Sequence, residues 1–347
     1  MTIVADTYDH VIGVDTHART HTYALVNART GGIEKTKTFP THPAGLARAL
    51  TWISQVTGTV LIACEGTGSY GRQLALLLAD AGLQVTEVRP PAKTSRVGTG
   101  KTDNIDARTA ARGILGTDTD QLITPRAPGA RHALAVLLAA RLRLDAHRTR
   151  LKNSLTALCR DTNLGIDART GITNAQITTI AAWRTRTTDD LDTTTCRDEA
   201  RRIAKEIHHL TAELAANRER LATIITDTTP ALLDINGVGP INGAKILNAY
   251  SHHGRIRTEA AFAKLAGTAP LPASSGNTTR HRLSRYGDRQ LNSALHRIAM
   301  TRLAHDPATQ AYRDKRTTHD ASNRDIHRSL KRYIAREIYR NLEHITA

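Results

Sequence analysis

The sequence has few aromatic residues, few cysteines and no long apolar run. Phe, Trp and Tyr make up 3 % of the 347 residues, so a core has to be built mainly from Leu, Ile, Val and Ala. The three cysteines are scattered, with no Cys-x-x-Cys pair and no histidine at zinc spacing, which argues against a disulfide framework or a zinc site. No segment has the length of a membrane span, and no secretory signal opens the chain. We therefore expect a soluble, cytoplasmic protein without a membrane partner.

Acidic residues are outnumbered by basic ones. The chain has 48 Lys and Arg against 32 Asp and Glu, a formal net charge of +16, and most of the basic residues are Arg. Such an excess favours a polyanionic partner, most simply nucleic acid, because the planar guanidinium fork suits phosphate and guanine. The alternative is a basic surface that is only solvated.

The length of the chain predicts two or three domains. Apolar and alternating runs predict strands at 10–17, 20–26, 33–39, 59–64 and 83–88, with helices at 43–56 and 69–81. Strands separated by helices are typical of an α/β domain with partly parallel strand pairing. We place this domain at residues 1–125.

Helical periodicity replaces this pattern after residue 130. Leu137, Leu144, Leu151 and Leu158 recur every seven residues, and a second heptad run extends over 200–224. Two such helices are expected to pair as an antiparallel coiled coil, which also favours dimerisation. The Thr-rich segment 161–196 between them is poorly periodic and is interpreted as an irregular insertion. This arm spans 126–228.

The last part of the chain, 229–347, is predicted to be mostly helical, so the whole is α/β plus α. The turn Gly237–Pro240 precedes a helix and resembles a helix-hairpin-helix, whose backbone N–H groups can bind a DNA phosphate. A purely structural turn is the other interpretation. A basic run follows at Arg280, Arg282 and Arg285.

Four acidic residues stand at the ends of predicted elements. Asp15 and Glu65 each close an apolar strand, and Asp103 and Asp106 lie three residues apart at the start of a helix, on one face of it. A capped helix start would explain the last two on its own. The first and fourth strands of an α/β sheet can be neighbours, however, and the four carboxylates would then form a cluster that needs Mg²⁺ or Mn²⁺. This layout resembles the ribonuclease H superfamily, particularly Holliday-junction resolvase-like nucleases.

The order of several motifs carries a closer resemblance. They are Ile12–His17, Glu65–Gly71, Lys101–Ala107, Gly237–Pro240, Ala266–Pro270, Ser274–Gly276, Arg282–Leu291 and the closing helix Arg332–Tyr339. In this order and spacing they resemble the DEDD transposases of the insertion sequence 110 family, to which the Piv-type DNA invertases are related. The resemblance covers nearly the whole chain.

The resemblance implies a site-specific recombinase that joins a mobile element to its target. Asp15, Glu65, Asp103 and Asp106 would hold the divalent metal, and a serine of the C-terminal domain would be the nucleophile. The family pattern places it at Ser275, with Ser274 as the alternative. A structured bridge RNA would pair with donor and target DNA. The candidate nucleic-acid contacts are Lys101, Gly237, Gly239, Arg280, Arg282 and Arg285, and the expected assembly is a homodimer or dimer of dimers associated with the nucleoid.

Two other functions fit parts of the sequence. One is an architectural DNA-binding protein with a helix-hairpin-helix and no catalysis, in which the acids only cap helices. The other is an actin-like ATPase, because Gly13–Thr16 and Gly66–Gly68 resemble phosphate motifs. The actin-like fold needs a second α/β half, however, where this chain has heptads.

Overall fold

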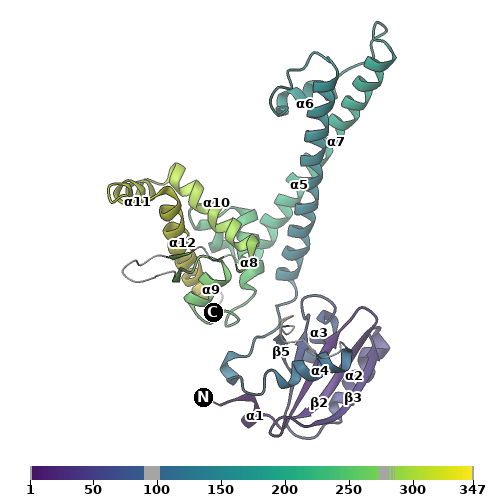
Figure 1. The fold of residues 1–347 in the computed structure, drawn as a ribbon, viewed down its shortest axis with the longest axis vertical. Coiled ribbons are helices and arrows are strands. Elements are labelled where there is room, and N and C mark those ends of the chain that lie inside the picture. The colour runs from purple at the N-terminus through teal and green to yellow at the C-terminus, as the bar shows by residue number, and fades with distance from the viewer. Residues whose placement is uncertain (1, 90–101, 273–280, 283, 285, 346–347) are drawn as a thin grey trace. The chain divides into compact units, whose positions relative to one another are not determined.

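The computed structural model describes residues 2–89, 102–272, 281–282, 284 and 286–345, with only the backbone at 272, 281 and 282 (Figure 1). The chain forms two compact units, Met1–Pro128 and Gly129–Ala347. None of the helices in these ranges is both long and apolar enough to cross a bilayer.

The first unit is built on a five-stranded mixed sheet of order β3-β2-β1-β4-β5. Its strands are β1 (His10–Thr16), β2 (Thr20–Asn27), β3 (Ile33–Pro40), β4 (Val60–Glu65) and β5 (Gln84–Val88). The first three form an antiparallel meander, whereas β4 pairs in parallel with β1 and with β5. The predicted strands are confirmed, and so is the prediction that the first and fourth strands are neighbours.

Helices cover both faces of this sheet (Figure 1). Side chains alternate along β1, so Ile12 and Val14 pack with α2 (Pro43–Ser54) and α3 (Arg72–Asp80). Val11 lies on the opposite face, in a core shared with α4 (Asp103–Arg112). Short helices α1 (Val4–Thr7) and η2 (Thr119–Gln121) complete the unit. The two faces therefore differ, and α4 covers the face on which Val11 lies.

Two long helices of the second unit, α5 (Ala130–Asp161) and α7 (Leu191–Thr228), run antiparallel (Figure 1). Asn217 Nδ2 donates to the carbonyl oxygen of Leu137 at 3.0 Å, and Arg141 Nη1 donates to that of Leu214, also at 3.0 Å. The start of α5 thus lies against the end of α7. The pairing of the two heptad runs is as expected, whereas their supercoiling as a coiled coil stays a prediction.

The segment between the long helices is more ordered than the sequence suggested. It contains α6 (Asn174–Ala181), whose Ile177 and Ile180 are buried in a core with residues of α5 and α7. Thr173 and Gln176 cap the helix reciprocally, which is the capping box. The interpretation of 161–196 as an irregular insertion was wrong at α6. The capping box is a short signal, and the Thr-rich segment around it has no clear helical periodicity.

Shorter helices form the rest of the second unit. They are η3 (Pro230–Asp234), α8 (Pro240–Tyr250), α9 (Glu259–Leu265), α10 (Arg289–His305), α11 (Pro307–Thr317) and α12 (Asn323–Ile345), together with a two-stranded ribbon of β6 (Leu271–Pro272) and β7 (His281–Arg282). Leu134 of α5 and Leu221 of α7 are buried in one core with Leu295 and Ile334. The base of the long helix pair is therefore continuous with these helices, and a separate domain beginning at residue 229 stays a prediction.

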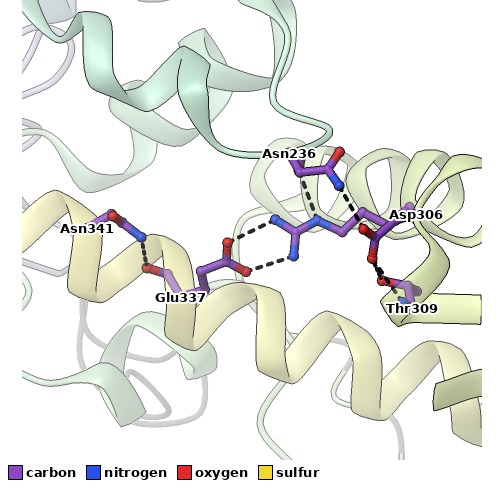
Figure 2. A network of polar contacts seen from close by, with 6 residues as sticks. Asn236, Asp306, Thr309, Glu337 and Asn341 are labelled. Carbon is purple, nitrogen blue, oxygen red and sulfur yellow. Dashed lines mark hydrogen bonds and ion pairs between the residues drawn. The ribbon is translucent and has the colours of Figure 1, made fainter. Parts of the chain in front are cut away.

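Arg302 of α10 ties three parts of this unit together (Figure 2). Its Nη1 and Nη2 donate to the two carboxylate oxygens of Glu337 at 2.7 and 3.1 Å, and its Nε donates to the carbonyl oxygen of Asn236 at 2.8 Å. Asn236 in turn donates to Asp306 at 3.2 Å, and Asp306 caps α11 through Thr309. The network holds the turn before α8 against α10 and α12.

Candidate metal centre

Asp15 and Glu65 end adjacent parallel strands. The pairing of β1 with β4 runs from His10 opposite Val60 to Val14 opposite Cys64, so the next residue of each strand is an acid. Asp15 lies on the same face as Val11, which is the face that α4 covers. Both carboxylates are buried, with 6 % of Asp15 and 8 % of Glu65 exposed. The sheet thus brings two acids to one edge.

The approach of α4 to this edge depends on Gly13. A Cβ atom on Gly13 would lie 2.0 Å from the carbonyl oxygen of Ala107 and 2.6 Å from the backbone nitrogen of Ala111. Only glycine allows the helix backbone this close to β1. The helix begins at Asp103, and the Oγ1 atom of its N-cap Thr102 accepts a hydrogen bond from the Ile105 N–H.

The close packing directs one face of α4 toward the sheet. Ala107, Ala110 and Ala111 are buried on that face, and Asp106 is buried with them at 8 % exposed. Asp103, one turn earlier, is exposed. Asp106 therefore lies on the buried face of α4, whereas Asp103 lies at the exposed start of the helix.

Three side chains at this edge could together hold a metal ion, and this group includes Asp15 and Asp103 but not Glu65 or Asp106. Asp15, His17 and Asp103 each offer a ligand atom, and the three atoms lie within 4.8 Å of one another. His17 Nδ1 is 3.4 Å from Asp15 Oδ2. His17 was not among the predicted ligands, although its position two residues after Asp15 at the end of a strand was a usable signal. Carboxylate oxygens suit Mg²⁺ and Mn²⁺, whereas an imidazole nitrogen is a softer ligand.

The loop after Glu65 turns back on itself. Gly66 has a φ of +61°, and its carbonyl oxygen accepts hydrogen bonds from the N–H groups of Ser69 and Gly71 at 2.8 and 3.0 Å. Thr16 Oγ1 donates to the carbonyl oxygen of Glu65 at 3.1 Å. A Cβ on Gly71 would lie 2.8 Å from that same oxygen. The glycines of this motif therefore fix the backbone around Glu65.

Cys64 lies beside the acids but takes no part in their chemistry. Its thiol is fully buried, and burial raises its pKa to about 12, with the charge of Glu65 as a smaller cause. A thiol with this pKa stays protonated at neutral pH. Only a thiolate is a good nucleophile or metal ligand, so Cys64 is a core residue.

Comparisons with protein families give two matches to this chain. A DEDD transposase model matches residues 12–163, and a model of transposases of the IS116/IS110/IS902 family matches residues 229–314. Together the matches cover more than half of the chain. It belongs to the IS110 family of transposases. A search of curated proteins finds no match.

Family membership decides between the functions that the sequence left open. A transposase cleaves and rejoins DNA, so the chain is an enzyme with DNA as a partner. DEDD transposase domains use divalent metal ions, and the first match includes Asp15, Glu65, Asp103 and Asp106. The carboxylates at this edge fit such an ion by their donor chemistry. Neither a purely architectural DNA-binding protein nor an actin-like ATPase agrees with these matches.

The turn before α8 has two glycines with different roles in the transposase. Gly237 has a φ of +82°, and a Cβ there would lie 3.1 Å from Ile298 Cγ2, so it is needed for packing against α10. Gly239 is the N-cap of α8 and has open space where a Cβ would be. The helix that precedes the turn is the 3₁₀-helix η3. Gly237 is thus required by the packing of the turn, Gly239 leaves space beside the start of α8, and contact of either with nucleic acid stays a prediction.

Several predicted site residues lie outside the described ranges. These are Lys101, Ser274, Ser275, Arg280 and Arg285, and of Arg282 only the backbone is described. The ribbon strands β6 and β7 flank the Ser274–Ser275 motif in the sequence and pair with each other, Pro272 opposite His281. The nucleophile and the basic run therefore stay predictions.

Proposed function

We propose that this transposase is a metal-dependent serine recombinase guided by an element-encoded RNA. In this proposal Asp15, Glu65, Asp103 and Asp106 bind Mg²⁺ or Mn²⁺, and Ser275 attacks the scissile phosphate, with Ser274 as the alternative. The observation that supports it most is the meeting of β1, β4 and the start of α4 at one edge of the sheet. His17 is added to the predicted set because of its place beside Asp15 and Asp103.

The donor chemistry of the edge supports a cation. Asp15, Glu65 and Asp106 are all at most 8 % exposed, and carboxylate oxygens are ligands that suit Mg²⁺ and Mn²⁺. When bound, a divalent ion stabilises negative charge on phosphate oxygens and lowers the pKa of a coordinated hydroxyl or water. The role of the chain is to orient the carboxylates through β1, β4 and α4 before the substrate arrives.

The serine step is a phosphoryl transfer. The Ser275 hydroxyl loses its proton, its Oγ forms a bond to phosphorus, and the bond from phosphorus to the departing sugar oxygen breaks, with a proton going to that oxygen. The phosphodiester is conserved as a covalent protein–DNA link, so attack by another strand end reverses the step and joins new partners. Serine needs such activation because its free hydroxyl is a weak nucleophile.

Charge and family resemblance support the nucleic-acid partners of the proposal. The net charge of +16 suits simultaneous binding of DNA and a structured bridge RNA, which would leave sequence reading to base pairing. Lys101, Gly237, Gly239, Arg280, Arg282 and Arg285 are the proposed contacts. A homodimer or dimer of dimers in the nucleoid would bring two such sites to a pair of DNA molecules.

The experiment is strand exchange reconstituted with element ends, target DNA and the RNA encoded beside the gene. We expect Ser275→Ala to abolish both strand exchange and the covalent protein–DNA adduct seen after denaturation, while Ser274→Ala retains both. Loss in Ser274→Ala alone would move the nucleophile to Ser274. Full activity of the double variant would refute the serine mechanism. Exchange that proceeds without added RNA would refute the guide.

A further inference from the structure

A cavity of about 510 Å³ lies within the second unit, apart from the acids of the sheet edge. Residues of α5, α7, α8 and α10 line it, and four of them carry positive charge: Arg141, Arg218, Lys245 and Arg297. These four residues are spread over more than a hundred and fifty residues of sequence, so no single motif contains them. We call this cavity with its lining residues the basic cleft.

Positive charge outnumbers negative charge in the basic cleft. Its one lining carboxylate, Asp145, attracts Arg141 and pairs with Arg148 at 2.8 Å, and Glu219 outside the lining pairs with Arg218 at 3.1 Å. Burial lowers the pKa of Lys245, and the charges of Arg297 and Arg141 lower it further, although Asp288 acts in the opposite sense. An anion in the cleft would relieve this repulsion.

The start of α8, an eleven-residue helix, also lines the cleft. Its N-cap Gly239 has no side chain to accept a backbone hydrogen bond, and Pro240 follows at the first position. The next N–H groups, of Ile241 and Asn242, have no acceptor within the helix. Both residues line the cleft. The partial positive charge of a helix start thus adds to the four cations.

Contacts with residues that do not line the cleft hold this helix start in place. Gly237 packs against Ile298, and Asn236 is held by Arg302 and Asp306 in the network of Figure 2. Arg141 is held by its hydrogen bond to Leu214, and Lys245 donates to Ser293 Oγ at 3.4 Å. A preorganised arrangement of this kind loses little conformational entropy when an anion binds.

We propose that the basic cleft binds a backbone phosphate of a nucleic acid. Arg141, Lys245 and the start of α8 contact the phosphate, and the exposed Arg218 and Arg297 contact its neighbours along the strand. Leu138, Leu142 and Ile241 provide apolar surface for the sugar. No aromatic residue lines the cleft to stack on a base, so the contact is independent of sequence. The inference rests on the proposed function for its partner, and it adds Arg141, Arg218, Lys245 and Arg297 to the turn at Gly239 that the sequence motif identified.

The test measures binding to duplex DNA and to structured RNA in EDTA over a range of KCl concentrations. We expect Lys245→Gln/Arg297→Gln to bind at least about ten-fold more weakly than wild type. The slope of log affinity against log salt should fall by about one per lost phosphate contact. Lys315→Gln/Arg316→Gln removes the same two charge types from the exposed end of α11 and should change affinity less than two-fold.

A second variant separates binding from folding. Asn242→Asp places a carboxylate in the first turn of α8, where it favours the helix, but repels a phosphate in the cleft. We expect unchanged or higher thermal stability together with weakened binding. Lys245→Arg, which keeps the charge, should bind like wild type.

The binding measurements with DNA and with RNA distinguish the possible occupants of the cleft. Loss with DNA alone, or with RNA alone, identifies the nucleic acid that occupies the cleft. Unchanged affinity and slope in both Lys245→Gln/Arg297→Gln and Asn242→Asp would refute the cleft while leaving the recombinase proposal standing. Wild-type protein that binds neither DNA nor RNA would refute both, because binding in EDTA requires neither metal nor the serine.

Discussion

Gly13 of β1 and Ala107 of α4 are in such close contact that a Cβ on Gly13 would lie 2.0 Å from the Ala107 carbonyl oxygen. This contact lies one residue from Asp106 in the helix and two residues from Asp15 in the strand. It therefore sets the separation between the acids of the sheet and those of the helix. The geometry of the proposed metal centre therefore depends on Gly13 as well as on the carboxylates.

Replacing Gly13 by Ala should disturb the metal centre without touching a ligand. The added methyl has to displace α4, and overpacking of this kind typically costs about 1–3 kcal/mol. We expect a lower melting temperature and weaker Mn²⁺ binding. Gly116→Ala is the matched control because a Cβ there meets nothing within 4 Å. Wild-type metal affinity in Gly13→Ala would show that α4 does not position the site.

The buried thiol of Cys64 should make the protein less stable at high pH. Burial raises the pKa of this thiol from 9.0 to about 12, so the folded state keeps its proton where the unfolded state loses it. The contribution is fully present below pH 9 and is lost as the pH rises from 9 to about 12. Denaturation followed at several pH values should show this decline, and Cys64→Ala should lessen it. An identical pH dependence in both proteins would contradict the assignment.

Chemical modification gives an independent check on the same residue. Cys64 should resist thiol reagents at pH 8 until the first unit unfolds, whereas the half-buried Cys196 should react sooner.

The Arg302 network should contribute measurably to the stability of the second unit. Arg302 is 11 % exposed and binds Glu337 through two hydrogen bonds, while Glu337 is 42 % exposed and partly screened. We expect Arg302→Met to lower the free energy of unfolding by about 1 kcal/mol, since the exposed carbonyl of Asn236 and the partly screened carboxylate of Glu337 lose their donor. Arg328→Met removes an exposed i,i+3 pair and should change it by less than about 0.5 kcal/mol. Equal effects would show that the network is not structural.

Local pattern was enough to predict the strands of the first unit and the place of the acids on them. Asp15 and Glu65 each follow a continuous apolar run, and parallel neighbours end at the same edge of a sheet. Asp103 and Asp106 were recognisable from their spacing at a helix start. These signals all lie within a few residues of the side chain concerned.

Features formed by distant residues could not be predicted in this way. Gly13 has no local turn to mark it, because its requirement comes from α4, more than ninety residues later. The basic cleft joins α5, α7, α8 and α10, and its Arg and Lys residues are ordinary members of an Arg-rich sequence. His17 was not predicted for a different reason: four carboxylates already account for a Mg²⁺ or Mn²⁺ site, and an imidazole nitrogen is a softer ligand than these ions prefer. The capping box of α6 could be recognised from Thr173 and Gln176, but it lies in a segment without clear helical periodicity.

The central claim, that the acids of β1, β4 and α4 form one cation site, is tested most directly by Mn²⁺ binding followed by electron paramagnetic resonance. Wild-type protein should bind Mn²⁺, whereas Asp15→Asn and Asp106→Asn should bind it much more weakly. Asp120→Asn, at an exposed acid of η2, should behave like wild type. Wild-type Mn²⁺ affinity in Asp15→Asn and Asp106→Asn would contradict the account.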